Sequence, residues 1–453
     1  MQKLSCSVII SFLFTFIFLP HISIAQQPRI SQFEKAELCD LLIDKAGVYH
    51  AVYQEKPDFG KPVFIYYTAS SNRGATWTKP ITLSNDNSGN GSGYPRILQD
   101  GSGRIYAIWK RYGTSDAKYP QQEPYLDGPG GKDPGTVFYK VLNGGAWSNQ
   151  VQINELEAGQ VSWFATVSPQ GLVYVFWTQA SEESIKNNRQ VWYYCDYMRF
   201  APLNGTSVGA ITDLSKPSPP VSEGGFPVEK RGGMNLQGYI DKDNLPHIIY
   251  EDEPDGIRRI KYFDGKTQTV VYTYQGYIKR NTFHDPAHLL TDEAGNDHLI
   301  LLPSDANLED QQIWDVNLAT KKTDVLLHLP ASVGSITGMQ ASQGPNGAMA
   351  VTFEMYRRLA NTEAYGLFYE KGKWQKTGLT NNAAKDKFMS KDFIGVGGYL
   401  TNITTSTTYN SQYTSVAYDA KGRKSMIMTI AAHWLSSAYS QDSPSVVFVP
   451  LDK

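Results

Sequence analysis

The chain has 453 residues, of which 19% are charged and 12% aromatic, with a formal net charge of −2. A chain so close to neutral has no overall basic field, so we expect no nucleic-acid partner. A length of this size usually indicates two or more domains. The 28 tyrosines and 9 tryptophans give a globular β composition with aromatic surface of the kind that carbohydrate binders use.

The first 25 residues have the pattern of a secretory signal peptide. Lys3 gives the positive start, residues 8–19 form an apolar core, and Ser23-Ile24-Ala25 is a small-x-small cleavage site. The apolar run is too short to favour a spanning helix. The sequence therefore predicts an exported protein, periplasmic or extracellular, with one mature domain at 26–453 and no membrane partner.

Residues 64–77, FIYYTASSNRGATW, combine a strand with a tight turn. Asn72 can bond the amides of its own turn, Gly74 supplies a positive φ, and the indole of Trp77 covers the hairpin. The segment resembles the Asp-box, the S/T-x-D-x-G-x-x-W turn of sialidase-like β-propellers, with Asn72 in place of the usual aspartate. The resemblance implies a propeller fold and a structural role, because in these families the box lies away from the active site.

A unit made of a strand, a tight turn of the D-x-x-G type and a second strand recurs seven times. The units span 36–53, 93–109, 161–177, 234–250, 285–301, 338–353 and 412–428, with turn residues Gly47, Gly103, Gly171, Asn244, Gly295, Gly347 and Gly422. Third strands are expected at 62–68, 136–141, 190–194, 259–263, 312–316, 365–370 and 445–450. The pattern predicts an all-β protein, a single seven-bladed β-propeller. Its last strand, 446–449, is expected to close the ring beside the N-terminal segment 29–33.

In a propeller the first strand of each blade lines the central channel. The start of that strand and the end of the second strand therefore open on one face, which we call the top. Strand-end residues from several blades are expected to bind substrate there: Arg96, Lys110, Arg111, Trp163, Arg231, Arg280 and Arg357. Three long segments, 112–135, 198–231 and 380–411, are expected to shape the site. The cations suit a uronate or sulfate, so the expected partner is an acidic polysaccharide or oligosaccharide.

Three histidines share one repeat position on the opposite face. His50, His247 and His298 each follow the turn residue of their unit by three positions. A residue type that recurs at one repeat position favours a structural role, which we expect for His247 and His298.

The whole arrangement is similar to glycoside hydrolase family 145, exported propellers that remove α-L-rhamnose from a glucuronic acid neighbour. The family has a catalytic histidine in its first blade, on the face opposite the usual propeller site. His50 in Val48-Tyr49-His50-Ala51 matches that placement. The resemblance implies an α-L-rhamnosidase-like hydrolase with His50 as acid/base, since an imidazole titrates near neutrality.

Two other functions remain open. The same fold carries ulvan lyases, and a lyase needs a base and a cation at the uronate. His284, Tyr277 and Arg280, near one another in sequence, are the residues that would serve. A non-catalytic glycan-binding propeller is the other alternative, because no pair of carboxylates can be assigned from the sequence.

Further motifs carry little weight. Tyr94-Pro95-Arg96-Ile97 superficially resembles the arginine motif of sialidases, but no ordered set of three arginines accompanies it. The sequence contains no persuasive metal motif, phosphate loop or nucleotide fingerprint, so no cofactor is expected. We expect the protein to be a monomer.

Overall fold

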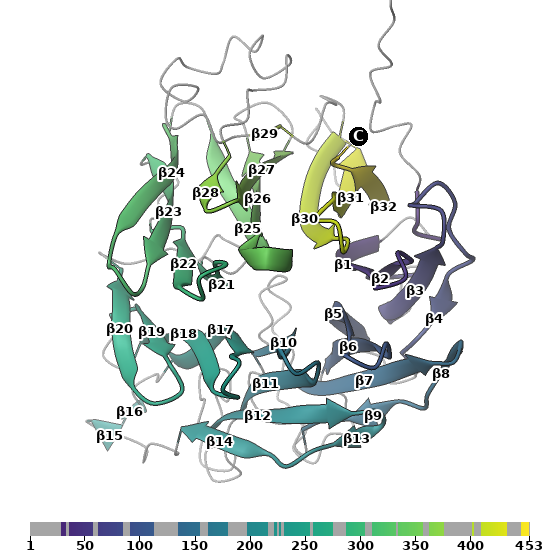
Figure 1. Ribbon diagram of the computed structural model, residues 1–453, viewed down its shortest axis with the longest axis horizontal. Helices are drawn as coiled ribbons and strands as arrows, with labels where there is room; N and C mark the ends of the chain where they lie inside the picture. Colours follow the sequence, from purple (N-terminus) through teal and green to yellow (C-terminus); the bar gives the residue numbers. More distant parts are fainter. Residues whose placement is uncertain are drawn as a thin grey trace, which may run out of the picture.

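The computed structural model describes residues 29–32, 36–57, 62–84, 91–112, 135–154, 162–179, 197–215, 222–223, 226–227, 231–253, 257–274, 287–303, 310–331, 334–356, 362–375, 401–402, 409–432 and 445–452. These residues form seven antiparallel sheets around a central opening, together with one small two-stranded sheet (Figure 1). The fold is the predicted seven-bladed β-propeller. Within the described ranges, no helix has the length and apolar character needed to cross a membrane.

In each blade the strands follow one another in sequence from the channel outward. Blades 1 to 3 contain β1 (Ala36–Ile43), β2 (Tyr49–Glu55), β3 (Phe64–Ser70) and β4 (Ile81–Thr82); β5 (Ser92–Gln99), β6 (Ile105–Tyr112), β7 (Gly135–Asn143), β8 (Ala146–Trp147) and β9 (Val151–Gln152); and β10 (Trp163–Val167), β11 (Val173–Gln179), β12 (Tyr197–Asn204), β13 (Ser207–Val208) and β14 (Thr212–Ser215). The small separate sheet that follows pairs β15 (Ser222–Glu223) with β16 (Phe226–Pro227).

The remaining four blades repeat the arrangement. They contain β17 (Arg231–Ile240), β18 (Pro246–Glu253), β19 (Arg259–Phe263) and β20 (Gln268–Thr273); β21 (Ala287–Thr291), β22 (Asp297–Leu301), β23 (Gln311–Asn317) and β24 (Thr323–Leu329); β25 (Ser335–Gln343), the short 3-10 helix η3 (Pro345–Gly347), β26 (Met349–Tyr356), β27 (Thr362–Glu370), β28 (Lys373–Trp374) and β29 (Thr401–Asn402); and β30 (Tyr409–Tyr418), β31 (Lys424–Ala432) and β32 (Ser445–Pro450). The seven innermost strands contact one another in a closed ring: β1, β5, β10, β17, β21, β25 and β30.

A tight turn joins the first two strands of every blade. All seven predicted turn residues have a φ between 62° and 90°, which only glycine and asparagine adopt readily. In blade 2, Asp100 starts the turn and accepts the backbone amides of Ser102 and Arg104, both at 2.9 Å. Turns of neighbouring blades touch, as where the Gly101 amide donates to the Gly171 carbonyl at 2.7 Å. The turns therefore lie on one side of the ring, the turn face.

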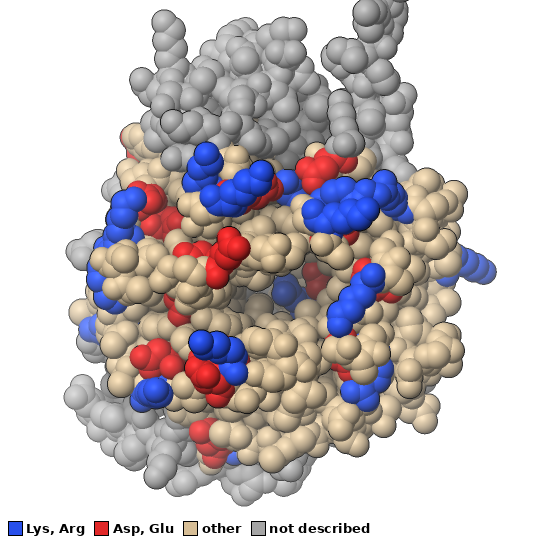
Figure 2. Space-filling view, viewed as in Figure 1, with Lys and Arg blue, Asp and Glu red and all other residues tan. Residues whose placement is uncertain are grey.

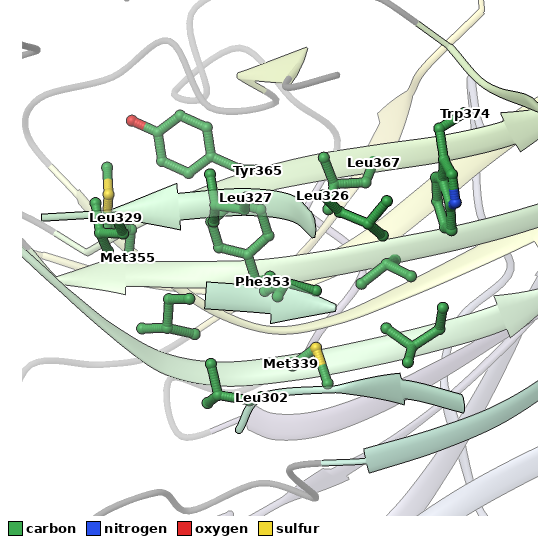
Figure 3. Packing of buried hydrophobic residues seen from close by; sticks show 14 of the residues in the cluster. Leu302, Leu326, Leu327, Leu329, Met339, Phe353, Met355, Tyr365, Leu367 and Trp374 are labelled. Carbon is green, nitrogen blue, oxygen red and sulfur yellow. The ribbon is translucent and has the colours of Figure 1, made fainter. Parts of the chain in front are cut away.

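Buried apolar side chains fill the spaces between adjacent blades. Among the described residues they form seven clusters, and each cluster joins two neighbouring blades. Between blades 5 and 6, Leu302 and Leu327 pack with Met339 and Phe353 (Figure 3). Full burial of such a side chain contributes roughly 1.5–3 kcal/mol. The blades thus stabilise one another around the ring.

The segment that resembles an Asp-box forms the turn between β3 and β4 and packs on the last blade. Asn72 fills the role of the usual aspartate, because its Oδ1 accepts the Thr76 amide at 2.9 Å and its Nδ2 donates to the Thr76 hydroxyl at 2.8 Å. Gly74, with φ 79°, lies against Phe448, and a Cβ there would stand 2.4 Å from that ring. The Trp77 ring centroid is 5.7 Å from that of Phe448. The box therefore joins blade 1 to blade 7.

The N-terminal segment completes the ring, as predicted. Arg29 forms a β-bridge with Val447 of β32, and the Ile30 amide donates to the Val446 carbonyl at 2.9 Å. The Ile30 side chain is buried in the cluster shared by blades 7 and 1. The last blade thus combines the C-terminal strand with the first described residues of the chain.

Blade 3 differs from the sequence prediction. Its third strand is β12, and the expected position at 190–194 lies outside the described residues. Residues 198–215, expected to belong to an insertion, supply the outer strands of this blade. Pro202 made the segment a poor strand candidate, because proline cannot donate to a ladder and is rare inside strands. Here Pro202 is paired with Tyr174, and its carbonyl accepts the Gly209 amide at 2.8 Å.

Candidate functional site at the channel

Seven residues occupy the same position on the innermost strands, each seven places before the turn residue of its blade. They are Asp40, Arg96, Phe164, Gln237, His288, Gln340 and Ser415, and we call them the ring residues. Six of the seven are polar, although their blades pack through apolar side chains. Figure 2 shows charged atoms of both signs inside the central opening. The channel is therefore the polar part of an otherwise apolar interior.

The ring residues connect neighbouring blades. Asp40 of blade 1 accepts the Ser415 hydroxyl of blade 7 at 2.7 Å. Across the channel, His288 of blade 5 hydrogen-bonds the Gln237 side chain of blade 4 at 2.9 Å and the Met339 carbonyl of blade 6 at 3.1 Å. His288 is thus held on both sides by protein groups, which makes it a structural residue of the channel wall.

Two places before the ring residue, four innermost strands contain a non-glycine residue with positive φ: Leu38 (41°), Tyr94 (55°), Asn235 (51°) and Tyr413 (51°). The strand register shifts by a β-bulge at each of them. Such backbone conformations cost roughly 1–3 kcal/mol each and cluster at functional sites, and bulges re-aim side chains beside active sites. The bulges lie at the end of the channel away from the turns, which is the predicted top face; we call it the bulge end.

Two glutamates lie beside the bulges of blades 1 and 7. Glu354 on β26 is buried and accepts the Tyr413 amide at 2.5 Å. Burial raises the pKa of Glu354 to about 8. Glu37 on β1 is exposed at the bulge end and pairs across the blade with Gln54. The surrounding protein limits the hydration of the Glu37 carboxylate, which raises the pKa of Glu37 despite a hydrogen bond from Gln54.

Two tyrosines connect these glutamates. Burial and the nearby charges of Glu37 and Glu354 raise the pKa of Tyr413, so its hydroxyl stays protonated. The Tyr94 amide donates to Gln54 Oε1 at 3.3 Å. Glu37, Gln54, Tyr94, Glu354 and Tyr413, drawn from four blades, therefore form one polar cluster, the bulge-end cluster.

Arg96 is a ring residue that stands two positions after Tyr94 of this cluster. Its Nε lies 3.6 Å from Asp40 Oδ2, beyond hydrogen-bond distance. Its guanidinium carbon lies 5.2 Å from the Phe164 ring centroid. The Arg96 side chain is 34% exposed, and within the described part of the chain its buried Nε has no hydrogen-bond partner. Arg96 thus presents a partly compensated positive charge to the channel.

The other predicted binding residues vary in placement. Lys110 is only 1% exposed, so it does not join the exposed groups at the bulge end. Arg111 places its guanidinium carbon 4.9 Å from the Phe138 ring centroid. Trp163 begins β10 and packs partly on the cluster between blades 2 and 3. Arg231 begins β17, but its side chain lies outside the described part of the chain. Four other predicted site residues lie wholly outside it: Tyr277, Arg280, His284 and Arg357.

His50 lies on the turn face and is enclosed by its own blade. Its Nε2 lies 3.2 Å from Asp44 Oδ2 and its Nδ1 lies 2.7 Å from the Tyr67 hydroxyl. The side chain is only 6% exposed, because both ring nitrogens are turned to partners within the blade. Burial lowers the pKa of His50 despite the favourable charge of Asp44. A catalytic role for His50 stays a prediction, and it would require substrate to displace one of these partners.

The two repeat-related histidines have a different environment. Each lies between the turn aspartate of its blade and a second aspartate: Asp297 for His247, at 2.9 Å, and Asp315 for His298, at 2.7 Å. Burial alone would lower the pKa values of both rings, but these carboxylates raise them. The contacts agree with the structural role expected for His247 and His298.

The bulge-end cluster could not be identified from the sequence. One signal for it exists, because Tyr94 and Tyr413 both stand nine residues before their turn residues, Gly103 and Gly422. Glu37 gave no such signal, since its exposure follows from the bulge at Leu38. No group of three potential metal ligands among His, Cys, Asp and Glu occurs within the described ranges.

Neither a protein-family model nor a curated protein matches the chain. Similar solved structures include a protein of unknown function from Dyadobacter fermentans, which is 14% identical with a TM-score of 0.43 over 94% of this chain and 97% of that one. An α-L-arabinanase of Penicillium chrysogenum complexed with arabinobiose is 13% identical, with a TM-score of 0.40 over 94% and 96%. The intramolecular trans-sialidase of Ruminococcus gnavus is 11% identical, with a TM-score of 0.41 over 94% and 96%. Similarities this low do not transfer an activity.

Proposed function

We propose that the protein is an exported carbohydrate-active enzyme that binds an acidic glycan at the bulge end of the channel. The observation that carries the proposal is the incompletely paired positive charge of Arg96. The Arg96 side chain is one-third exposed, its Nε lies 3.6 Å from Asp40 Oδ2, and its guanidinium carbon lies over the Phe164 ring. A carboxylate that met this guanidinium would gain charge-assisted hydrogen bonds of roughly 1.5–3 kcal/mol each. Tyr94, two residues away, adds an aromatic surface of the kind that sugar rings contact.

Within this class we favour an α-L-rhamnosidase-like hydrolase that cleaves rhamnose from glucuronic acid. The uronate carboxylate supplies the anion for Arg96. Hydrolysis of a glycosidic bond also needs an acid that is protonated at working pH. At the same end of the channel, burial raises the pKa of Glu354 to about 8 and limited hydration raises the pKa of Glu37, so both environments favour the protonated carboxyl.

Three other arrangements remain to be separated by experiment. A hydrolase that uses His50 would work from the turn face. A polysaccharide lyase acting by β-elimination would use a base such as His284, with Tyr277 and Arg280. A glycan-binding propeller would bind acidic sugars without turnover. Each arrangement predicts a different product, or a different residue whose substitution abolishes activity.

Product analysis on a rhamnose–glucuronate oligosaccharide tests the proposal. Free rhamnose is the result expected of the hydrolase. New ultraviolet absorbance from an unsaturated uronate would instead identify a lyase, and binding without either product would identify a glycan-binding protein. Arg96→Gln should weaken binding of the acidic oligosaccharide, whereas Arg111→Gln, a cation that lies on the Phe138 ring, should change it less.

A further inference from the structure

We propose that Glu37 is the general acid of the reaction at the bulge end, the residue that protonates the glycosidic oxygen as the bond breaks. The inference rests on the proposed function as a glycoside hydrolase and assigns a role to a residue that no sequence motif indicated. It is carried by the exposure of Glu37, its position at a bulge and the groups that surround it.

Exposure separates Glu37 from the other carboxyl groups near this end. Glu55, Glu251 and Glu354 are each no more than 2% exposed, so they cannot reach a sugar without rearrangement. Asp40 is 8% exposed and already accepts two donors, a hydroxyl and a backbone amide, with the Arg96 guanidinium nearby. Glu37 is exposed and forms no ion pair with any other described residue.

The backbone and Gln54 fix the orientation of the Glu37 carboxyl. The register of β1 against β2 shifts between Glu37 and Cys39, with Leu38 at φ 41°, so Glu37 leaves the regular alternation of the strand. Gln54 lies opposite and hydrogen-bonds the carboxyl. Tyr413, from the adjacent blade, lies close enough to Glu37 for the Glu37 charge to raise the pKa of the Tyr413 hydroxyl. Gln54 is therefore a positioning residue.

The environment also favours the protonated form that a general acid needs. The protein around the channel raises the pKa of Glu37. Glu354 lies behind Tyr413 and is itself protonated near neutrality. In the reaction the proton of Glu37 passes to the glycosidic oxygen, and the bond from that oxygen to the anomeric carbon breaks with its electron pair staying on oxygen. Water adds to the anomeric carbon, and its released proton passes to solvent, from which Glu37 is reprotonated.

A comparison of two leaving groups tests this role. The substrates are rhamnosyl-glucuronic acid, whose aglycone leaves poorly without protonation, and 2,4-dinitrophenyl α-L-rhamnoside, whose phenolate leaves unaided. Glu37→Gln keeps the shape and the hydrogen bond to Gln54 but removes the proton. We expect kcat/KM for the disaccharide to fall by about 10²–10⁴-fold, the scale of general acid catalysis. For the dinitrophenyl substrate the fall should be less than about tenfold, because that step needs no acid.

The matched control is Asp324→Asn, which neutralises a half-exposed carboxylate on β24 at the outer edge of blade 5 and should leave both rates unchanged. Equal losses on both substrates would show that Glu37 shapes the site without donating a proton, and no loss on the disaccharide would exclude any role; either result overturns the assignment. Absence of rhamnose from the wild-type reaction is a separate outcome, which would overturn the proposed function and the role of Glu37 with it.

Discussion

The Tyr67 hydroxyl lies 2.7 Å from Nδ1 of His50, at the place where blade 5 puts the Asp315 carboxylate 2.7 Å from Nδ1 of His298. A hydroxyl can donate to a neutral imidazole, whereas a carboxylate can only accept and so favours the imidazolium. Burial lowers the pKa of both rings; at His298 the carboxylates of Asp315 and Asp292 outweigh this effect, whereas His50 has Asp44 alone and a hydroxyl in place of the second carboxylate. Histidines that look equivalent in the repeat therefore have pKa values shifted in opposite directions.

The first prediction concerns the catalytic role of His50. His50→Ala leaves Asp44 and Tyr67 without their partner inside the blade, so we expect a loss of about 2–3 kcal/mol in the free energy of unfolding. Turnover of rhamnosyl-glucuronic acid per folded molecule should stay within a few-fold of wild type if the site is at the bulge end. Urea unfolding and product analysis check both values. A hundredfold fall in turnover with unchanged stability would instead place the active site on the turn face.

The second prediction concerns pH. The raised pKa of His298 means that its stabilisation is fully present below the unfolded pKa, near 6.5, and is lost as pH rises through the folded value. The lowered pKa of His50 gives the opposite sign: its stabilisation is present above pH 6.5 and is lost as pH falls through the folded value. His298→Gln should therefore destabilise more at pH 6 than at pH 9, and His50→Gln more at pH 9. Melting temperatures across this range test the contrast, and parallel pH profiles would contradict it.

The third prediction concerns Glu354, whose pKa is raised to about 8. A buried carboxyl that stays protonated in the folded state costs stability as pH rises from about 4.5 to about 8, because the unfolded chain releases the proton first. Glu354→Gln keeps an acceptor for the Tyr413 amide and removes the titration. We expect the variant to be more stable than wild type at pH 8, by about 4 kcal/mol, and nearly equal at pH 4.5. A wild-type advantage at pH 8 would show that the ionised form is stabilised by its partners.

The fourth prediction compares two glycines with nearly the same φ, Gly74 at 79° and Gly372 at 75°. A Cβ at Gly74 would stand 2.4 Å from Phe448, whereas nothing lies within 4 Å of one at Gly372. Gly372→Ala should cost about 1 kcal/mol for the backbone conformation alone. Gly74→Ala should cost about 3 kcal/mol, because the contact between blades 1 and 7 must also open. Equal losses in urea unfolding would contradict this, because they would mean that Phe448 can move away from the new Cβ at no cost in the free energy of unfolding.

The fifth prediction concerns Arg96. Arg96→Lys keeps the charge but loses the planar group that lies over Phe164. Arg96→Gln loses both. We expect affinity for a glucuronate-containing oligosaccharide, measured by calorimetry, to fall about tenfold or more for the Gln variant and less for Lys. Binding of a neutral oligosaccharide of the same length should change little, and an equal loss for both ligands would argue that Arg96 only supports the channel wall.

Local turn chemistry made the fold predictable. Each turn residue from Gly47 to Gly422 needs a positive φ, and each stands at a fixed place in its unit, so the sequence alone located seven hairpins. The prediction was wrong where a local signal was misleading. Pro202 makes its segment look unlike a strand, although pairing with β11 makes that segment the third strand of blade 3.

The candidate site was predictable only in part. Arg96 could be placed at the channel because it stands at a fixed distance from Gly103. Whether its charge is compensated depends on Asp40 of another blade, which no local pattern reveals. Likewise, Glu354 and Tyr413 meet only because two blades pack together. The enclosure of His50 follows from the cross-strand position of Tyr67, which lies 17 residues away.

The bridge between Arg29 and Val447 has a consequence for how the chain folds. The hydrogen bond from the Val446 amide to the Ser31 hydroxyl spans 415 residues, nearly the whole sequence. Such contacts form late, because the entropy of closing so long a loop must be overcome first. Until then β32 has an open edge that can pair with another chain. Removing the N-terminal residues through Ile30 should therefore leave this edge open. Folding would then compete with self-association, and its outcome would depend on protein concentration.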